Sequence, residues 1–187
     1  KETKAKITWY IAKATRERED LPEGSYENAL QDLAKDFPNT RYGKIAADRS
    51  KAMDFKVGGD PLPFRVQTLD GGAFELPSNQ TKGKPVLLCF LAADIPDSES
   101  AARALEGLRQ QFNPDQLTML GIWLDAKTSD AAAAIKKFGL SFPQTNPAGG
   151  WDSDLALRFR MENAPQCILI DRRGKIAGMN YLVIYKS

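Results

Sequence analysis

The stretch KGKPVLLCFLAADIPDS, residues 82–98, decides how the rest of the chain is interpreted. After the turn-forming residues 82–85, residues 86–92 are continuously apolar, which predicts a central strand covered on both faces. The next residues with helical spacing are Ala101, Leu105, Leu108 and Phe112, and they predict a helix over residues 96–112. The segment is therefore predicted to form a strand, a short polar loop and a helix.

Short elements alternate on either side of this segment. Residues 64–69 and 73–76 flank Asp70-Gly71-Gly72, which predicts a β-hairpin. Further strands are predicted over residues 117–124, 166–170 and 176–184, and further helices over residues 129–138 and 152–160. This order predicts an α/β fold with a mixed central sheet and helices on both of its faces.

The first 53 residues have a helical pattern instead. Ile7, Tyr10, Ile11 and Ala14 form one apolar stripe, and we expect Trp9 and Tyr10 to be the docking face of this first helix. Ser25 is a candidate cap of a second helix that ends near residue 36, and Thr40 of a third. The second and third helices loosely resemble a tetratricopeptide-type hairpin. We therefore predict a helical extension over residues 1–56 and a separate domain over residues 57–187.

The composition excludes several classes of chemistry. The 187 residues include no histidine, which removes Ser-His-Asp and Cys-His catalytic sites and histidine metal sites. The two cysteines, Cys89 and Cys167, are 78 positions apart, so there is no C-x-x-C and no cysteine-rich metal site. We expect no metal and no cofactor. A net charge of +2 gives no reason to expect nucleic-acid binding, and no apolar run is long enough to span a membrane.

Five segments, in this order, resemble the TlpA/ResA branch (AhpC/TSA-redoxin type) of the thioredoxin superfamily. They are residues 59–64, 82–92, 120–125, 138–143 and 164–176. The resemblance implies a thioredoxin-like fold and membership of a thiol-disulfide oxidoreductase family. It also implies a periplasmic or other extracytoplasmic location, with any membrane anchor lying outside this chain in a longer precursor.

The chain departs from that family at the redox motif. Relatives carry C-x-x-C where the helix after the central strand begins, because the helix N-terminus stabilises a thiolate there. Here Ile95 and Ser98 stand at the two cysteine positions, and neither side chain can exchange disulfides. We therefore expect no dithiol catalysis by the family mechanism.

Other family features are kept. Pro165 stands at the position of the family's cis-proline, whose neighbouring backbone pairs with substrate in relatives. The resemblance thus implies a groove for a protein or peptide, formed by Asp94, Ile95, Pro96, Asp97, Ser98, Ala164 and Pro165. A simpler interpretation is that Asp94 only caps the helix, that Asp97 only complements its dipole, and that the cis bond only belongs to the fold.

Three functional hypotheses remain open from the sequence. The first is a redox-inactive module that binds a protein or peptide through this groove. The second is a structural or assembly role, in which the helical extension and the last strand make the contacts. The third is an oxidoreductase acting through Cys89 or Cys167, for which no mechanism can be constructed. Both cysteines are expected to be buried as small apolar residues, and they could form a cross-strand disulfide if their strands align.

Overall fold

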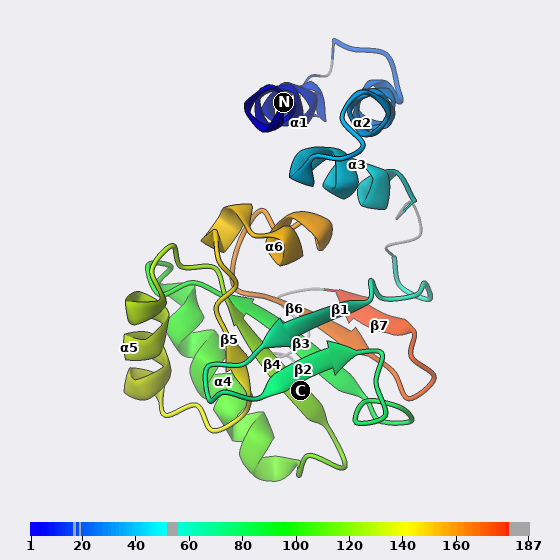
Figure 1. Cartoon of the computed structure of the whole chain (residues 1–187). Helices are drawn as coiled ribbons and strands as arrows, with labels where there is room; N and C mark the ends of the chain where they lie inside the picture. The colour runs from blue at the N-terminus through cyan, green and yellow to red at the C-terminus, as the bar shows by residue number, and fades with distance from the viewer. Residues whose placement is uncertain (17, 19, 52–55, 180–187) are drawn as a thin grey trace. The chain divides into compact units, whose positions relative to one another are not determined.

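The computed structural model describes the whole chain except residues 17, 19, 52–55 and 180–187 (Figure 1). It divides into two compact units, Lys1–Asp54 and Phe55–Ser187. The first consists of helices, and the second contains every strand described here.

Three helices make up the first unit: α1 (Glu2–Arg16), α2 (Ser25–Asp36) and α3 (Arg41–Lys51). The predicted cap of the third helix is confirmed, since the Thr40 hydroxyl accepts a hydrogen bond from the Gly43 N–H at 3.1 Å. Ser25 is instead the first residue of α2, and Gly24 precedes it in the left-handed conformation (φ 83°). The third helix was predicted to reach Met53, which lies outside the described residues.

The predicted apolar stripe of the first helix is wrong, whereas the predicted docking face is half right: Trp9 is buried and Tyr10 is not. Ile7 and Ile11 are 57% and 61% exposed, and Tyr10 is also exposed. The buried side of α1 consists of Ala5, Trp9 and Ala12. Two apolar stripes share the helical period in this segment, and the buried one combines two alanines with a tryptophan. The small alanines allow close approach of a neighbouring helix, and the Trp9 ring lies 6.1 Å from that of Tyr42 on α3.

A five-stranded mixed sheet forms the centre of the second unit, in the order β5-β4-β3-β6-β7. Its strands are β3 (Val86–Leu91), β4 (Thr118–Trp123), β5 (Gln144–Thr145), β6 (Gln166–Ile170) and β7 (Ile176–Met179). β3 runs parallel to β4 and antiparallel to β6. A separate hairpin of β1 (Phe64–Gln67) and β2 (Ala73–Leu76) confirms the turn predicted at Asp70-Gly71-Gly72.

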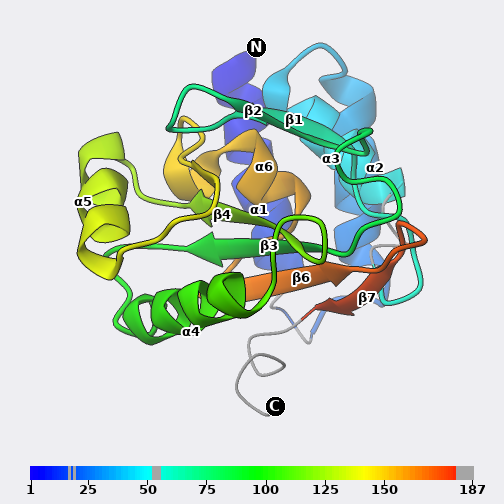
Figure 2. The same cartoon turned by 90° about the horizontal axis from the view of Figure 1, so that it is seen from below.

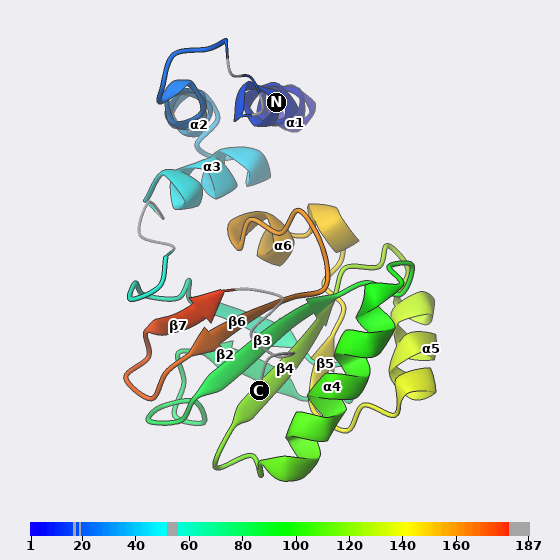
Figure 3. The same cartoon turned by 180° about the vertical axis from the view of Figure 1, so that it is seen from behind.

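Both faces of the sheet are covered, as predicted. Helices α4 (Asp97–Gln111) and α5 (Thr128–Phe138) lie on one side, whereas α6 (Asp154–Arg158) and the β1–β2 hairpin lie on the other (Figures 2 and 3). Consecutive residues of β3 alternate between the two cores. Val86, Leu88 and Phe90 face α6 and the hairpin, whereas Leu87, Cys89 and Leu91 face α4 and α5. This explains why the strand shows no polar alternation in sequence.

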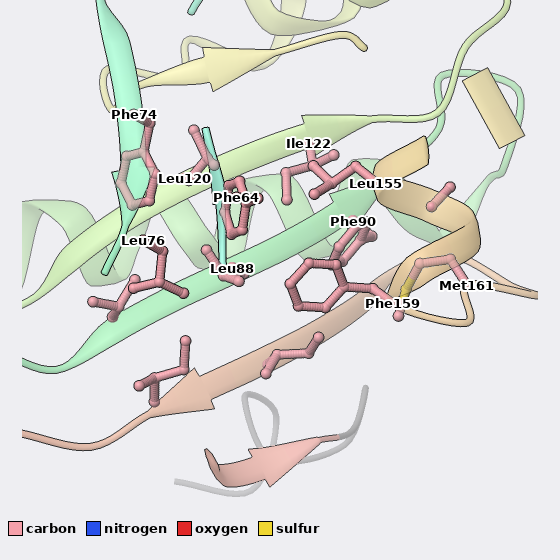
Figure 4. Close-up of a cluster of buried hydrophobic side chains, with 14 of the residues drawn as sticks. Phe64, Phe74, Leu76, Leu88, Phe90, Leu120, Ile122, Leu155, Phe159 and Met161 are labelled. Atoms are coloured by element: carbon pink, nitrogen blue, oxygen red, sulfur yellow. The ribbon is translucent and has the colours of Figure 1, made fainter. Parts of the chain in front are cut away.

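Aromatic rings close the core beneath the hairpin (Figure 4). The Phe159 ring, from the end of α6, lies 5.6 Å from Phe90 and 5.6 Å from Phe64, meeting the latter edge to face at 87°. Phe64 also stacks on Phe74 of β2 at 6.1 Å. Each fully buried ring of this kind contributes roughly 1.5–3 kcal/mol to stability. The hairpin forms a separate two-stranded sheet. These rings fix it in place, together with two hydrogen bonds to β5: the Leu69 N–H donates to the Gln144 C=O, and the Thr145 Oγ1 donates to the Gln67 C=O, each at 2.8 Å.

Several predicted boundaries differ from the structure. The helix predicted over residues 152–160 is the short α6, and a 3₁₀ turn, Gly150–Asp152, precedes it. The two-residue strand β5 was not predicted, because two residues are too few for a periodic pattern. The last strand ends at Met179 within the described residues, and the rest of the predicted strand, residues 180–184, lies outside them.

Candidate functional site

The candidate site lies at one end of the sheet. β3 ends at Leu91, and the antiparallel β6 begins at Gln166, which pairs with Phe90. The loop that follows β3 and the segment that precedes β6 therefore lie at the same end of two neighbouring strands. We call residues 93–96 the site loop. The predicted residues Asp94, Ile95 and Pro96 are on this loop, and Ala164 and Pro165 are on the facing segment.

Ser98, which stands at the second cysteine position of the family motif, is a buried structural residue. It lies in the first turn of α4 and is only 1% exposed. Its Oγ accepts a hydrogen bond from the Ala92 N–H at 3.2 Å, and Ala92 is fully buried. The hydroxyl thus gives a partner to a backbone donor at the point where the chain leaves β3. Ser98 is not on the exposed surface of the predicted groove.

A second anchor of the site loop is Asp125, two residues after the end of β4. Its Oδ1 accepts a hydrogen bond from the Ala93 N–H at 2.9 Å, whereas its Oδ2 is buried and has no hydrogen-bond partner. Asp125 is only 8% exposed, and burial raises the pKa of its carboxyl. The hydrogen bond from Ala93 opposes this rise, and the negative charges of Asp94 and Asp130 add to it.

Neither of the two exposed acids of the predicted site, Asp94 and Asp97, caps the helix α4 through its side chain. Pro96 is the N-cap of α4, without a side-chain capping bond, so the predicted capping by Asp94 is wrong. The donors of the first turn pair with backbone instead: Ser98 N–H with Ile95 O at 3.0 Å, and Glu99 N–H with Pro96 O at 3.3 Å. Asp97 is the first residue of α4, where its charge complements the helix dipole.

The facing segment contains a cis peptide bond between Ala164 and Pro165. Pro165 is buried, and Ala164 is partly buried. Ala164 and Ile95 both pack against the core that contains Phe90 and Phe159. Among the backbone hydrogen bonds of the described residues, none involves the N–H or the C=O of Ala164. This leaves one donor and one acceptor for pairing at the end of β6.

The two cysteines lie away from this loop, in the core beneath α4. Cys89 and Cys167 are directly opposite each other on β3 and β6, so their strands align as the sequence analysis required for a disulfide. Both are free thiols, 0% and 5% exposed, and their sulfur atoms are 3.1 Å apart. Burial, together with the hydrogen bond from Cys167, raises the pKa of the Cys89 thiol well above its usual value. A thiol in this environment is a poor nucleophile.

The other regions of the described structure give weaker support for a functional site. A groove of about 840 Å³ lies at the opposite end of β3 and β6, between the segment around Pro77–Lys84 and the turn at Asp171–Gly174, so it is not part of this site. In the part of the chain that the structure describes, no group of three Cys, Asp or Glu side chains could hold a metal ion. Nor does any described helix combine the length and the apolar character that a membrane span needs.

The amino-acid sequence of the chain also matches a known protein family. The model of the AhpC/TSA family matches residues 50–179, which is most of the chain. The chain belongs to the AhpC/TSA family. No match to a curated protein was found.

Three solved structures with a similar fold are described as thiol-disulfide oxidoreductases or as a thiol:disulfide interchange protein. The C-terminal domain of a putative thiol-disulfide oxidoreductase from Bacteroides thetaiotaomicron is 26% identical with a TM-score of 0.61, over 67% of this chain and 86% of that one. A thiol-disulfide oxidoreductase from Bacteroides fragilis is also 26% identical, with a TM-score of 0.59, over 67% and 90% of the two chains. A putative thiol:disulfide interchange protein DsbE from Chlorobium tepidum, 21% identical with a TM-score of 0.58 over 67% and 84%, shares the fold.

Sequence reasoning missed Asp125 as part of the site of this AhpC/TSA family member. The residue was noted only as the last position of a family-like segment, residues 120–125. An acid placed directly after a continuous apolar strand is a usable signal, because it must lie at the end of the sheet where loops gather. Its contact with Ala93 joins segments that are 32 residues apart, and such a contact cannot be read from local patterns.

Proposed function

We propose that this protein is a redox-inactive thioredoxin-like module that binds an extended protein or peptide segment beside Ala164 and the site loop. The observation that carries the proposal is the unpaired backbone at Ala164, which precedes β6 and packs on the same core as the partly buried Ile95. An extended chain laid here can form main-chain hydrogen bonds with Ala164 and place an apolar side chain against Ile95. Ser98 supports the loop and does not touch the ligand.

The charge at this surface favours a basic ligand. Asp94 and Asp97 are both exposed, and Asp125 adds a third acidic group behind the loop. Clustered like charges of this kind attract a partner of opposite charge and increase its association rate, an effect that salt reduces. We therefore infer a lysine- or arginine-containing segment as the ligand class.

Loss of dithiol exchange follows from the side chains at the motif. Ile95 carries a hydrocarbon branch and Ser98 a buried hydroxyl, so no thiolate forms at the start of α4. In an insulin-reduction assay with dithiothreitol, the protein should give the same rate as the reagent alone. Clear acceleration would overturn redox inactivity. A Cys89→Ala variant would then show whether the buried pair is responsible.

Peptide binding can be tested with an array of extended peptides in which charge and backbone are varied separately. We expect basic peptides to bind, and Asp97→Lys to weaken binding by roughly tenfold. The matched control is Glu75→Lys, an exposed acid of β2 that lines the groove at the opposite end of β3 and β6, which should change binding little. N-methylation of the one peptide amide that pairs with the Ala164 C=O should abolish binding, whereas N-methylation of its two neighbours should change binding little, because their amides point away from the partner strand.

Equal binding by wild type and Asp97→Lys, with no effect of N-methylation, would refute the groove. It would favour the structural or assembly role instead. The exposed apolar residues Ile7, Tyr10 and Ile11 of α1 would then be the next surface to test.

An extracytoplasmic location is part of the same proposal. It rests on the resemblance to TlpA/ResA-type proteins, and a membrane anchor would have to lie outside this chain. Fractionation of the source cells, with an antibody against this domain, tests it. Recovery only from the cytoplasmic fraction would overturn it.

A further inference from the structure

Two residues that the proposed function does not use are brought together by the sheet. Cys89 is the fourth residue of β3, and Cys167 is the second residue of β6. The antiparallel register pairs them directly, with Leu88 opposite Ile168 on one side and Phe90 opposite Gln166 on the other. Directly opposite residues of antiparallel strands point to the same face of the sheet. Both cysteines accordingly belong to the core under α4 and α5.

The geometry of this pair suits a covalent bond. Directly opposite antiparallel residues have Cα atoms about 4.5 or 5.5 Å apart, and both spacings lie within the range of disulfides. The sulfur atoms are already 3.1 Å apart as thiols. Bond formation therefore needs only a small side-chain movement and no change of register. The chain has no other cysteine, so no competing intramolecular pairing exists.

We propose that Cys89 and Cys167 form an intramolecular disulfide that joins β3 to β6 when the chain folds in an oxidising environment. The oxidant is a low-molecular-weight disulfide. One cysteine thiolate attacks it, releases one small thiol and forms a mixed disulfide. The second cysteine thiolate then attacks the cysteine sulfur of that mixed disulfide, and a second small thiol leaves. In total, two cysteine thiols lose two protons and two electrons, and the oxidant is reduced to two thiols.

Burial determines when this reaction can occur. Cys89 and Cys167 are 0% and 5% exposed, and their strands are flanked by β4 on one side and β7 on the other. An oxidant cannot reach either sulfur while the sheet is closed. Exchange therefore takes place before the sheet forms, or during rare separation of β3 from β6. The same shielding protects the finished disulfide from reductants, so it acts as a covalent link within the core and not as a catalytic group.

This inference is independent of peptide binding at the site loop. The two sites involve different residues and opposite requirements for access, because the loop is exposed and the cysteines are enclosed. A negative result for peptide binding would not contradict the disulfide, and a negative result for the disulfide would not contradict peptide binding.

The test uses the full chain, reduced and denatured, and then refolded in a buffer of reduced and oxidised glutathione. We expect the intact mass to fall by two hydrogens, and peptide mapping to link Cys89 to Cys167. Folded, reduced protein given the same buffer should oxidise far more slowly, because the sheet must open first. The oxidised protein should unfold roughly 10 °C above the reduced form, since the bond closes a loop of 78 residues.

Cys89→Ala and Cys167→Ala are the matched controls. Each should show no loss of two hydrogens and no redox-dependent shift of the unfolding temperature. Refolded wild type that has native circular dichroism but keeps two free thiols would overturn the proposal. So would oxidation only to glutathione adducts or to disulfide-linked dimers.

Discussion

Replacing Ser98 with alanine should destabilise the second unit, because the Ser98 side chain joins α4 to the backbone just after β3. Its Oγ lies 3.2 Å from the Ala92 nitrogen, and both residues are essentially inaccessible to solvent. Ser98→Ala removes the acceptor and leaves the Ala92 N–H buried without a partner. Such a loss costs about 1–3 kcal/mol of the free energy of unfolding. For a chain of this size, that corresponds to a fall of roughly 2–10 °C in the unfolding temperature.

The measurement combines urea denaturation with amide hydrogen exchange on the full chain. Exchange at Ala92 should accelerate more than at the neighbouring central positions of β3, because the lost bond is local. Ser100→Ala is the matched control. Ser100 is exposed on the same helix, and its Oγ donates a hydrogen bond to the Asp97 carbonyl in the first turn, at 3.0 Å. Its free energy of unfolding should stay within about 0.5 kcal/mol of wild type.

One result would refute the reasoning. If Ser98→Ala and Ser100→Ala have equal stability and exchange at Ala92 is unchanged, the Ser98 hydroxyl does not hold the loop. Ser98 would then be a vestige of the redox motif with no structural role.

Two further predictions concern residues around the site. Asp125→Asn should raise the free energy of unfolding at neutral pH, because burial raises the pKa of the Asp125 carboxyl and its ionised form is disfavoured in the fold. The wild type regains stability as the pH falls through that raised pKa toward the ordinary value near 4, so the difference between the two urea midpoints should close. A difference that stays constant with pH would contradict the raised pKa. Gly121→Ala should lower the free energy of unfolding by about 2 kcal/mol or more in chemical denaturation, because a Cβ would lie 2.0 Å from Gln144 Oε1 and displace the acceptor of the buried Trp123 Nε1–H (2.8 Å). Gly107→Ala, with open space around it on α4, should instead be neutral or stabilising, and equal effects at the two glycines would refute the steric argument.

The elements that could be predicted from sequence are those whose signal is local. The Asp70-Gly71-Gly72 turn is enough to predict its own hairpin. Residues 86–92 predict a strand that is buried on both faces, because every position is apolar. The order of these signals was enough for the fold, since few topologies connect them.

The features that escaped prediction depend on contacts distant in sequence. Two apolar stripes of α1 satisfy the same period, and only the neighbouring helices decide that Ala5 and Ala12 are buried beside Trp9 while Ile7 and Ile11 are exposed. In the same way, Asp94 is suited to capping α4, but the backbone carbonyls of Ile95 and Pro96 already accept the first donors. The role of Asp125 depends on β4 ending beside β3, which is a property of the sheet and not of either strand alone.

The supports of the site loop have a consequence for how such a protein can change over time. Ala92 and Ala93 are held through their backbone amides, by acceptors on α4 and after β4. The side chains of Asp94 and Pro96 point to solvent and are not required by either support. Substitutions at these outward positions can therefore accumulate while the loop keeps its course. A lineage could lose one chemistry here and acquire a new binding preference without first rebuilding the scaffold.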